Sequence, residues 1–215
     1  GLYLRDSDAI LTGNNIHNNH AQHGGALYLY ASPATLDRNI IYSNNSSVMG
    51  TVNLQLSAAT LTNNSILTNT ATSYGGGLFV SASPATIRGN TIRANTAHED
   101  GGGIYVLASE AVVDGNIIQA NGATDQGGGI YAEGTSETLI YHNQITGNSA
   151  AGVGGGVFLY NSGAMVRGNT ISDNTTDGYG GGLFAESSNA SLIGNTISNN
   201  LADLGDGGLR LQMGS

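Results

Sequence analysis

Two carboxylates, Glu133 and Glu186, are the pair best placed for general acid and base chemistry in this 215-residue chain. They hold the same place in two repeats of a unit of 25–27 residues, with one further repeat between them. If each repeat forms one coil stacked at strand spacing, the two side chains lie roughly 10 Å apart. That distance slightly exceeds the span of the carboxylate pair in an inverting glycosidase, and Tyr160 lies between them. We therefore predict that the chain is not an enzyme.

The charge balance narrows the range of ligands. The chain has six Arg, no Lys and a net charge of −9. Nucleic acid is therefore not expected as a partner, and a lyase for acidic polymers would need a basic cleft that this composition does not supply. Arg88 and Asp114 are expected to be vertical neighbours that form a surface ion pair of little energetic weight.

Two groups of side chains raise the question of metal binding. His17, His20 and His23 are close in sequence and of a type that binds zinc or nickel. We expect His17 to project from a strand and the other two to lie in a solvated loop. Acidic residues before the glycine runs are either Ca²⁺ ligands or a solvated set whose repulsion water relieves: Glu99, Asp100, Asp125, Asp177, Asp203 and Asp206. No cofactor is expected, with Ca²⁺ as the alternative.

A column of aromatic residues is the third feature with possible chemistry. It recurs at one slot of the repeat, and alternation places it on the outward face of a strand whose aliphatic residues point inward. Two interpretations of the column remain open. Either the rings simply stabilise neighbouring strands by stacking, or the column is a contact surface for sugar rings, a second protein or another copy of the chain. The candidate binding or assembly surface comprises Tyr3, Tyr28, Phe79, Tyr105, Tyr131, Phe158 and Phe184.

All these side chains are positioned by the repeat itself. The slot of Gly77 recurs through eight full periods, from Gly1 to Gly208, in steps of 25–27 residues. A fixed period in this range indicates a solenoid. Each period contains three short apolar runs separated by turn residues. We therefore predict an all-β, single-domain right-handed parallel β-helix over residues 1–215, with three parallel sheets and about eight coils.

Two columns of Asn accompany the strands. Stacked at strand spacing, they can form amide ladders along the axis, which would satisfy polar groups that are costly to bury. The first column lies at the corner after the second run: Asn14, Asn39, Asn64, Asn90, Asn116, Asn143, Asn169 and Asn195. The second lies three residues after the Ile of the third run: Asn19, Asn44, Asn69, Asn95, Asn121, Asn148, Asn174 and Asn200.

The corner before the first Asn column is usually Gly, which enters the left-handed backbone region at little cost. Arg38, Asn63 and His142 replace it in three coils. We expect some backbone strain at these three positions.

The chain begins and ends inside a repeat, with no recognisable cap at either end. A solenoid needs caps to hide its terminal coils, so we expect this domain to be a piece of a longer chain or to stack end to end with copies of itself. Its expected partners are flanking domains, itself or a polysaccharide. No apolar segment predicts a membrane span, and the absence of Cys is compatible with an extracellular or bacterial cell-surface location.

The repeat resembles two groups of known proteins. In fold pattern the chain resembles the right-handed parallel β-helix superfamily, which includes pectate lyases and related polysaccharide-acting enzymes. In motif it is similar to the repeats of bacterial polymorphic outer-membrane proteins: Gly24-Gly25-Ala26-Leu27 matches their Gly-Gly-Ala-aliphatic motif, and Ile92-Arg93-Ala94-Asn95 matches Phe-x-x-Asn with Ile for Phe. The resemblance covers nearly the whole chain and implies the fold more strongly than a function.

We therefore predict a non-enzymatic structural or adhesive β-helix, acting as a stalk, adhesin or filament component. The alternative is a carbohydrate-binding or polysaccharide-modifying module, which would use the aromatic column. An ice-binding solenoid would need regular Thr columns. The slot before the core Ile is too mixed for that, since it holds Asn, Ile, Ser, Thr and Gln.

Overall fold

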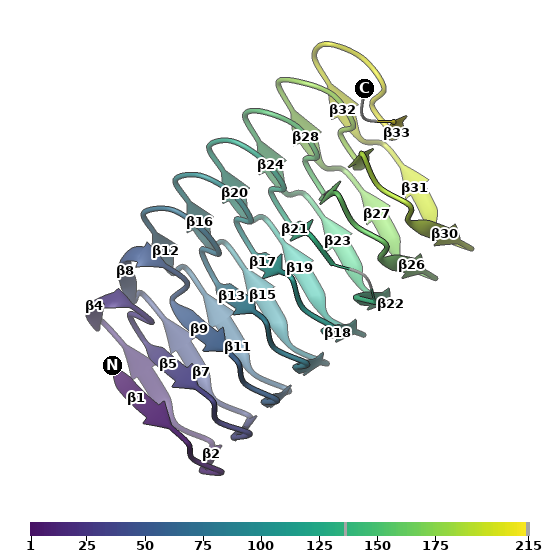
Figure 1. Cartoon of the computed structure of the whole chain (residues 1–215). Coiled ribbons are helices and arrows are strands. Elements are labelled where there is room, and N and C mark those ends of the chain that lie inside the picture. The colour runs from purple at the N-terminus through teal and green to yellow at the C-terminus, as the bar shows by residue number, and fades with distance from the viewer. Residues whose placement is uncertain (136, 214–215) are drawn as a thin grey trace.

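A computed structural model describes residues 1–135 and 137–213 of the chain. Within that range every regular element is a parallel β-strand, and the coils stack along one axis (Figure 1). The predicted right-handed parallel β-helix of about eight coils is confirmed. No helix among the described residues is long and apolar enough to cross a membrane.

The first sheet carries the Gly-aliphatic-aromatic-aliphatic runs. In the inner coils each strand buries two aliphatic residues in the interior and turns the residue between them to the opposite face, because successive side chains alternate. That residue is aromatic in every strand except those of Asn53 and Arg210. Its nine strands, in order, are β1 (Leu2–Arg5), β5 (Leu27–Tyr30), β9 (Val52–Gln55), β13 (Leu78–Ser81), β17 (Ile104–Leu107), β21 (Ile130–Glu133), β25 (Val157–Tyr160), β29 (Leu183–Glu186) and β33 (Leu209–Gln212).

The second sheet contains the runs that begin after a small buried residue. Each of its strands is three residues long, and only the central residue of each strand points inward. Its eight strands are β2 (Ile10–Thr12), β6 (Thr35–Asp37), β10 (Thr60–Thr62), β14 (Thr86–Arg88), β18 (Val112–Asp114), β22 (Leu139–Tyr141), β26 (Met165–Arg167) and β30 (Ser191–Ile193). The predicted neighbours Arg88 and Asp114 form an ion pair at 3.0 Å.

The third sheet is centred on the column of Ile. The central residue of each strand points into the interior, and it is fully buried from Ile41 to Ile171. The eight strands are β3 (Asn15–His17), β7 (Ile40–Tyr42), β11 (Ser65–Leu67), β15 (Thr91–Arg93), β19 (Ile117–Gln119), β23 (Gln144–Thr146), β27 (Thr170–Ser172) and β31 (Thr196–Ser198).

A fourth sheet was not predicted, so the expectation of three sheets is wrong in number. It follows the second Asn column and is made mostly of two-residue strands with a small residue facing inward, such as Ala71 or Ala97. Small residues give a weak strand pattern, and it was not recognised. The strands are β4 (His20–His23), β8 (Asn45–Met49), β12 (Thr70–Ala71), β16 (Thr96–Ala97), β20 (Gly122–Ala123), β24 (Ser149–Ala150), β28 (Thr175–Thr176) and β32 (Leu201–Ala202).

The glycine runs have a steric cause. After the fourth sheet the chain crosses back to the first, and it passes directly against the backbone of the next coil. A Cβ on Gly102 would lie 2.4 Å from the carbonyl oxygen of Gly122, and a Cβ on Gly103 would lie 3.0 Å from the Nδ2 atom of Asn121. Any larger residue would push neighbouring coils apart at this point.

Both predicted Asn ladders are present. Asn121 is representative: its Nδ2 donates to the carbonyl oxygen of Ile92 at 2.9 Å and to Oδ1 of Asn148 at 3.0 Å, while its backbone N–H donates to the same Oδ1 at 3.0 Å. The members in the middle coils are buried and fully engaged. The ladders therefore join adjacent coils through side chains as well as through the sheets.

A third polar ladder was missed. A Ser or Thr follows the first sheet in each coil, and the backbone N–H of one coil donates to the hydroxyl of the next, as from Ser57 to Ser83 at 2.9 Å. The signal was present in the sequence as a column at one slot: Ser7, Ser32, Ser57, Ser83, Ser109, Thr135, Ser162 and Ser188.

The three corners that lack Gly adopt the left-handed conformation that Gly would favour. Arg38, Asn63 and His142 have φ angles of 54°, 55° and 50°. The expected strain is therefore located at these positions, where the repeat imposes the backbone shape on residues that rarely adopt it.

Candidate functional site

The aromatic column lies on the outer face of the first sheet, as predicted, but the expectation that it is exposed is wrong for most of it. Only the first two rings retain substantial exposure; Tyr3 is 55% exposed. The other five are at most 5% exposed and form a second apolar cluster, comprising Phe79, Tyr105, Tyr131, Phe158 and Phe184. The column is therefore chiefly a structural element and not an open contact stripe.

Loops that return from the fourth sheet to the first cover these rings. They are the long arcs on one edge of the coils in Figure 1. Met49 at the end of β8, together with Tyr74 and Val153 from these loops, packs on the cluster. Neighbouring rings along the column are 4.7–5.4 Å apart between centroids, which is in the range of favourable aromatic contacts.

The column is interrupted by an amide. Asn53 occupies the slot between Tyr28 and Phe79, is fully buried, and has no hydrogen-bond partner for its Oδ1. In the first coil, the buried Nδ1 atom of His23 also has no hydrogen-bond partner among the described residues. The coil of Asn53 therefore departs from the aromatic packing of the coils that follow it.

A cavity of about 480 Å³ opens where the loops, the aromatic column and the next outward slot of the first sheet meet. We call it the lateral groove. Tyr74, Asp100 and Gln126 reach it from the loops, and the other residues reach it from strands of the first sheet. Those strand residues are Tyr105, Tyr131, Glu133, Phe158, Tyr160 and Glu186.

The two carboxylates first considered for catalysis lie in this groove. Glu133 pairs with Tyr160 and Tyr160 with Glu186 along adjacent strands, as the repeat predicted. The hydroxyl of Tyr105 donates a hydrogen bond of 2.5 Å to Oε2 of Glu133. This contact fixes Glu133 against the aromatic column, while Tyr160 stays 39% exposed between the two acids.

Asp100 is the unexpected member of the groove. Its side chain accepts a hydrogen bond from the backbone N–H of Gln126 at 3.0 Å. The pKa of Asp100 is raised to about 6, chiefly by burial and to a smaller extent by the nearby Asp125, Glu99 and Glu133, against the lowering effect of that hydrogen bond. Asp100 was predicted only as one of a set of loop acids, because the period does not show how a loop folds over a sheet. Comparing the residue before each glycine run would have revealed the column that contains Tyr74, Asp100 and Gln126.

The tyrosine hydroxyls of the groove stay protonated over a wide pH range. Burial raises the pKa of Tyr105 and Tyr131 well above the usual value, and Glu133 adds to both shifts. The neighbouring Glu99 carboxylate, followed by burial, raises the pKa of Tyr74 to about 12. All three hydroxyls therefore act as hydrogen-bond donors and not as bases, and Tyr105 already donates to Glu133.

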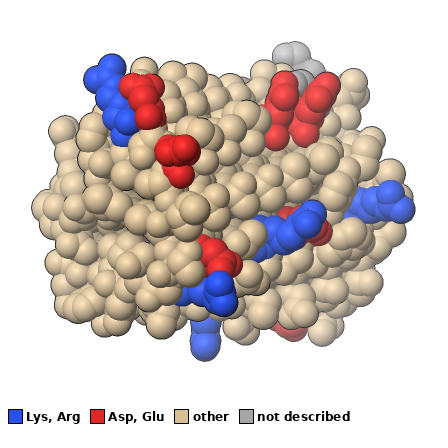
Figure 2. Space-filling model, turned by 90° about the horizontal axis from the view of Figure 1, so that it is seen from below, with Lys and Arg blue, Asp and Glu red and all other residues tan. Residues whose placement is uncertain are grey.

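The acids of the groove are not neutralised by the protein. Among residues 1–135 and 137–213, none of Asp100, Glu133 and Glu186 has an Arg or His nitrogen within 4 Å. Four of the six Arg are instead paired with Asp elsewhere. Figure 2 shows several such pairs on one face of an otherwise weakly charged surface.

The three histidines of the first coil do not converge. His17 stacks on Tyr42 with ring centroids 4.8 Å apart. His20 lies in β4 and not in a loop as expected, and its ring nitrogens are 3.1 Å from Oδ1 of Asn45 and 3.1 Å from Oγ of Ser47. Within the described part of the chain, no group of three His, Cys, Asp or Glu side chains is arranged to hold a metal ion.

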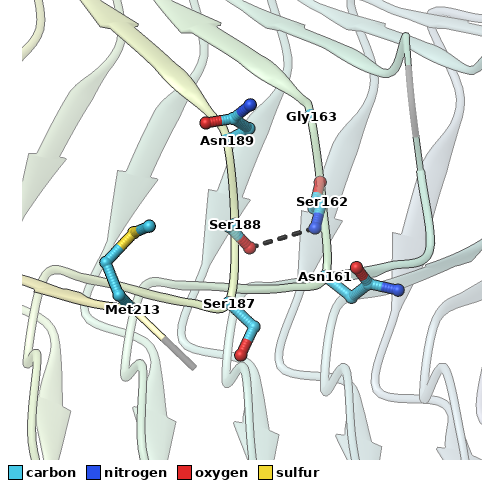
Figure 3. Close-up of a pocket in the computed structure, with 7 residues that line it drawn as sticks. All are labelled: Asn161, Ser162, Gly163, Ser187, Ser188, Asn189 and Met213. Atoms are coloured by element: carbon cyan, nitrogen blue, oxygen red, sulfur yellow. Dashed lines mark hydrogen bonds between the residues drawn. The ribbon is translucent and has the colours of Figure 1, made fainter. Parts of the chain in front are cut away.

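A second depression, of about 570 Å³, lies at the turn between the first and second sheets near the last coils (Figure 3). It is lined by hydroxyls, amides and Met213. Ser188 already accepts from the backbone N–H of Ser162 at 3.0 Å and donates to carbonyl oxygens, so its hydroxyl is used by the serine ladder. It offers less free chemistry than the lateral groove.

Comparison with protein families gives one match that covers most of the chain. Residues 51–209 match the family described as "Periplasmic copper-binding protein (NosD)". The matched segment contains every residue of the lateral groove. No curated protein matches the chain.

Proposed function

Since the chain belongs to the NosD family, we propose that it is a non-enzymatic β-helix of the cell envelope that holds a ligand along its side. The lateral groove is the observation that carries the proposal. Carboxylates without an Arg or His partner and tyrosine hydroxyls line it, and a stacked aromatic column fixed by neighbouring coils supports it. The family's periplasmic description supports a cell-envelope location.

The family description also names copper, and the donors of this chain do not fit a copper site. The chain has no Cys, and the soft thiolate ligands that favour Cu(I) are therefore absent. The described residues bring no three His, Cys, Asp or Glu together. Met49, Met165 and Met213 lie in different coils. Copper has no part in the function proposed.

A rigid binding element is consistent with the uninterrupted architecture. The sheets and the Asn ladders run through the whole described stack without a break. Such a stack resists local rearrangement because each coil is bonded to both neighbours. This rigidity suits a scaffold that presents side chains at fixed spacing.

The test is an incubation of the purified chain with neutral and acidic polysaccharides, followed by mass spectrometry and a reducing-end assay. We expect no product over prolonged incubation. Product formation by the wild-type chain that is lost in Asp100→Asn would overturn the non-enzymatic proposal. Glu110→Gln is the matched control, since Glu110 is an exposed carboxylate outside the groove.

A carbohydrate-binding or polysaccharide-modifying module is the second candidate. Asp100 favours it, because a carboxyl with a pKa near 6 can donate a proton at mildly acidic pH. Tyr160 offers a partly exposed ring for a sugar between Glu133 and Glu186. Titration with neutral oligosaccharides checks this candidate, and weaker binding by Tyr160→Ala would support it.

A further inference from the structure

We propose that the lateral groove binds an organic cation: a small ligand with two or more ammonium groups, such as a linear polyamine. This inference rests on the proposed function, since it names the ligand class of the same groove. Its basis is the combination of carboxylates without a basic partner, tyrosine hydroxyls and an open cavity of about 480 Å³ at one place.

Charge is the first argument. Asp100, Glu133 and Glu186 line one cavity, and no Arg or Lys lines it with them. Carboxylates gathered in a cleft produce a negative potential that attracts cations. A neutral sugar would leave that potential uncompensated, whereas an ammonium group would neutralise it and donate hydrogen bonds to the carboxylate oxygens.

The same face of the first sheet already holds a cation in this manner. At the end of the aromatic column, Arg210 takes the slot of the ring. Its guanidinium lies 4.1 Å from the ring centroid of Tyr179 and 5.7 Å from that of Phe184, and its Nη1 donates to Oδ2 of Asp206 at 2.7 Å. Aromatic rings and one carboxylate thus form a cation site in this coil. The lateral groove is lined by the same two kinds of group, aromatic rings and carboxylates.

Spacing is the third argument, and it favours a ligand with several charges. Glu133 and Glu186 lie in register two strands apart, on either side of Tyr160. That separation is roughly 10 Å by strand spacing. A flexible polyamine can place one ammonium group against each glutamate while its methylene chain crosses the exposed ring of Tyr160.

A bare metal ion does not fit the same arrangement. No three acidic or imidazole side chains of the described residues are close enough to coordinate one ion. Carboxylates spread along a groove suit a ligand that distributes its charges along a chain.

The experiment is isothermal titration calorimetry of the purified chain with spermidine at pH 7.5 and low salt. We expect saturable binding that weakens as salt rises. Glu133→Gln and Glu186→Gln should each weaken binding roughly fivefold, in keeping with the loss of one partly exposed charge pair. Glu110→Gln, an exposed acid outside the groove, should bind like wild type. Circular dichroism and thermal melting check that all variants fold.

Two results would overturn the inference. One is an equal loss in Glu110→Gln and the groove variants, which would show general attraction to an acidic protein. The other is no spermidine binding by the folded wild-type chain. A parallel titration with maltohexaose distinguishes a wrong ligand class from a wrong function. If the sugar binds and spermidine does not, the groove is a binding site but not for cations. If neither ligand binds, the proposed function is contradicted as well.

Discussion

The inward face of the third sheet and the outer face of the first sheet differ in how much their residues vary from coil to coil. In the third sheet every coil has Ile at the inward position. On the first sheet the outward slot of Glu133 holds six different residue types in nine strands, among them Arg5, Ser81 and Leu107. An interior side chain must fit between identical neighbours above and below, so variation is costly. An outward side chain has no such constraint, and chemistry can collect there.

The comparison explains why the groove spans only a few coils. The stack provides the same backbone everywhere, but Asp100, Glu133 and Glu186 line one cavity only in the coils from the loop of Asp100 to β29. The repeat therefore fixes where the side chains lie, and the residues that vary between coils form the groove proposed to bind a ligand.

The interior should be the least tolerant region. Ile118 is fully buried, and Ile118→Asp places an unpaired charge in the core, which should prevent folding of the array. Ile117, the preceding residue of β19, is 40% exposed on the outer face. Ile117→Asp should therefore fold. Circular dichroism and size exclusion compare the two, and a soluble, folded Ile118→Asp protein would contradict the register.

Substitution in the buried part of the aromatic column should have the next largest effect on stability. Phe158→Ala removes a ring that is 1% exposed and contacts Tyr131 and Phe184, so it should lower the free energy of unfolding by about 3–5 kcal/mol. Tyr3→Ala, at the exposed end of the same column, should cost less than about 1 kcal/mol. Denaturant melts measure both. Equal costs would mean that burial beneath the loops adds no stability.

The sequence was sufficient to predict what repeats. The period predicted the β-helix, the inward aliphatic columns, both Asn ladders and the register of Glu133 with Glu186. A column is detectable because one physical demand acts on every coil.

The sequence was not sufficient where the signal is weak or not periodic. The fourth sheet has short strands with Ala and Ser inside, which lack the apolar contrast of the other three. The loops cover the rings by a path that alternation does not show, so their burial was missed. That loop path brings Asp100 into the cavity that Glu133 lines, and no spacing in the sequence indicates that the two share it.

Each member of the Asn ladders should contribute less to the free energy of unfolding than each buried ring of the aromatic column. Asn121→Leu removes an amide that donates to Asn148 and Ile92, and it leaves buried groups without partners. The expected loss is about 1–3 kcal/mol in the free energy of unfolding. Asn14→Leu, an exposed member of the other ladder in the first coil, should lose less. Chemical denaturation measures both, and an unchanged midpoint for Asn121→Leu would show that the ladder is not stabilising.

The smallest effect expected is the pH dependence of stability caused by Asp100. Its pKa in the folded protein is about 6, above the ordinary value of 3.8. A raised pKa contributes stability that is fully present below the unfolded value and is lost as pH rises through about 6. The folded chain should therefore lose stability between pH 4 and pH 7. Since the carboxyl is partly exposed, solvent screening reduces the loss to about 1 kcal/mol.

Asp100→Asn tests this directly, because the amide oxygen can still accept from the backbone N–H of Gln126. The free energy of unfolding of the variant should equal that of wild type at pH 4, where Asp100 is uncharged in the folded protein. At pH 7 it should exceed the wild-type value by about 1 kcal/mol. Glu110→Gln, an exposed acid outside the groove, should follow the wild-type profile. Urea melts at several pH values measure the difference. Parallel profiles for wild type and Asp100→Asn would show that Asp100 is solvated like an ordinary surface acid, and that the loops do not shield the groove.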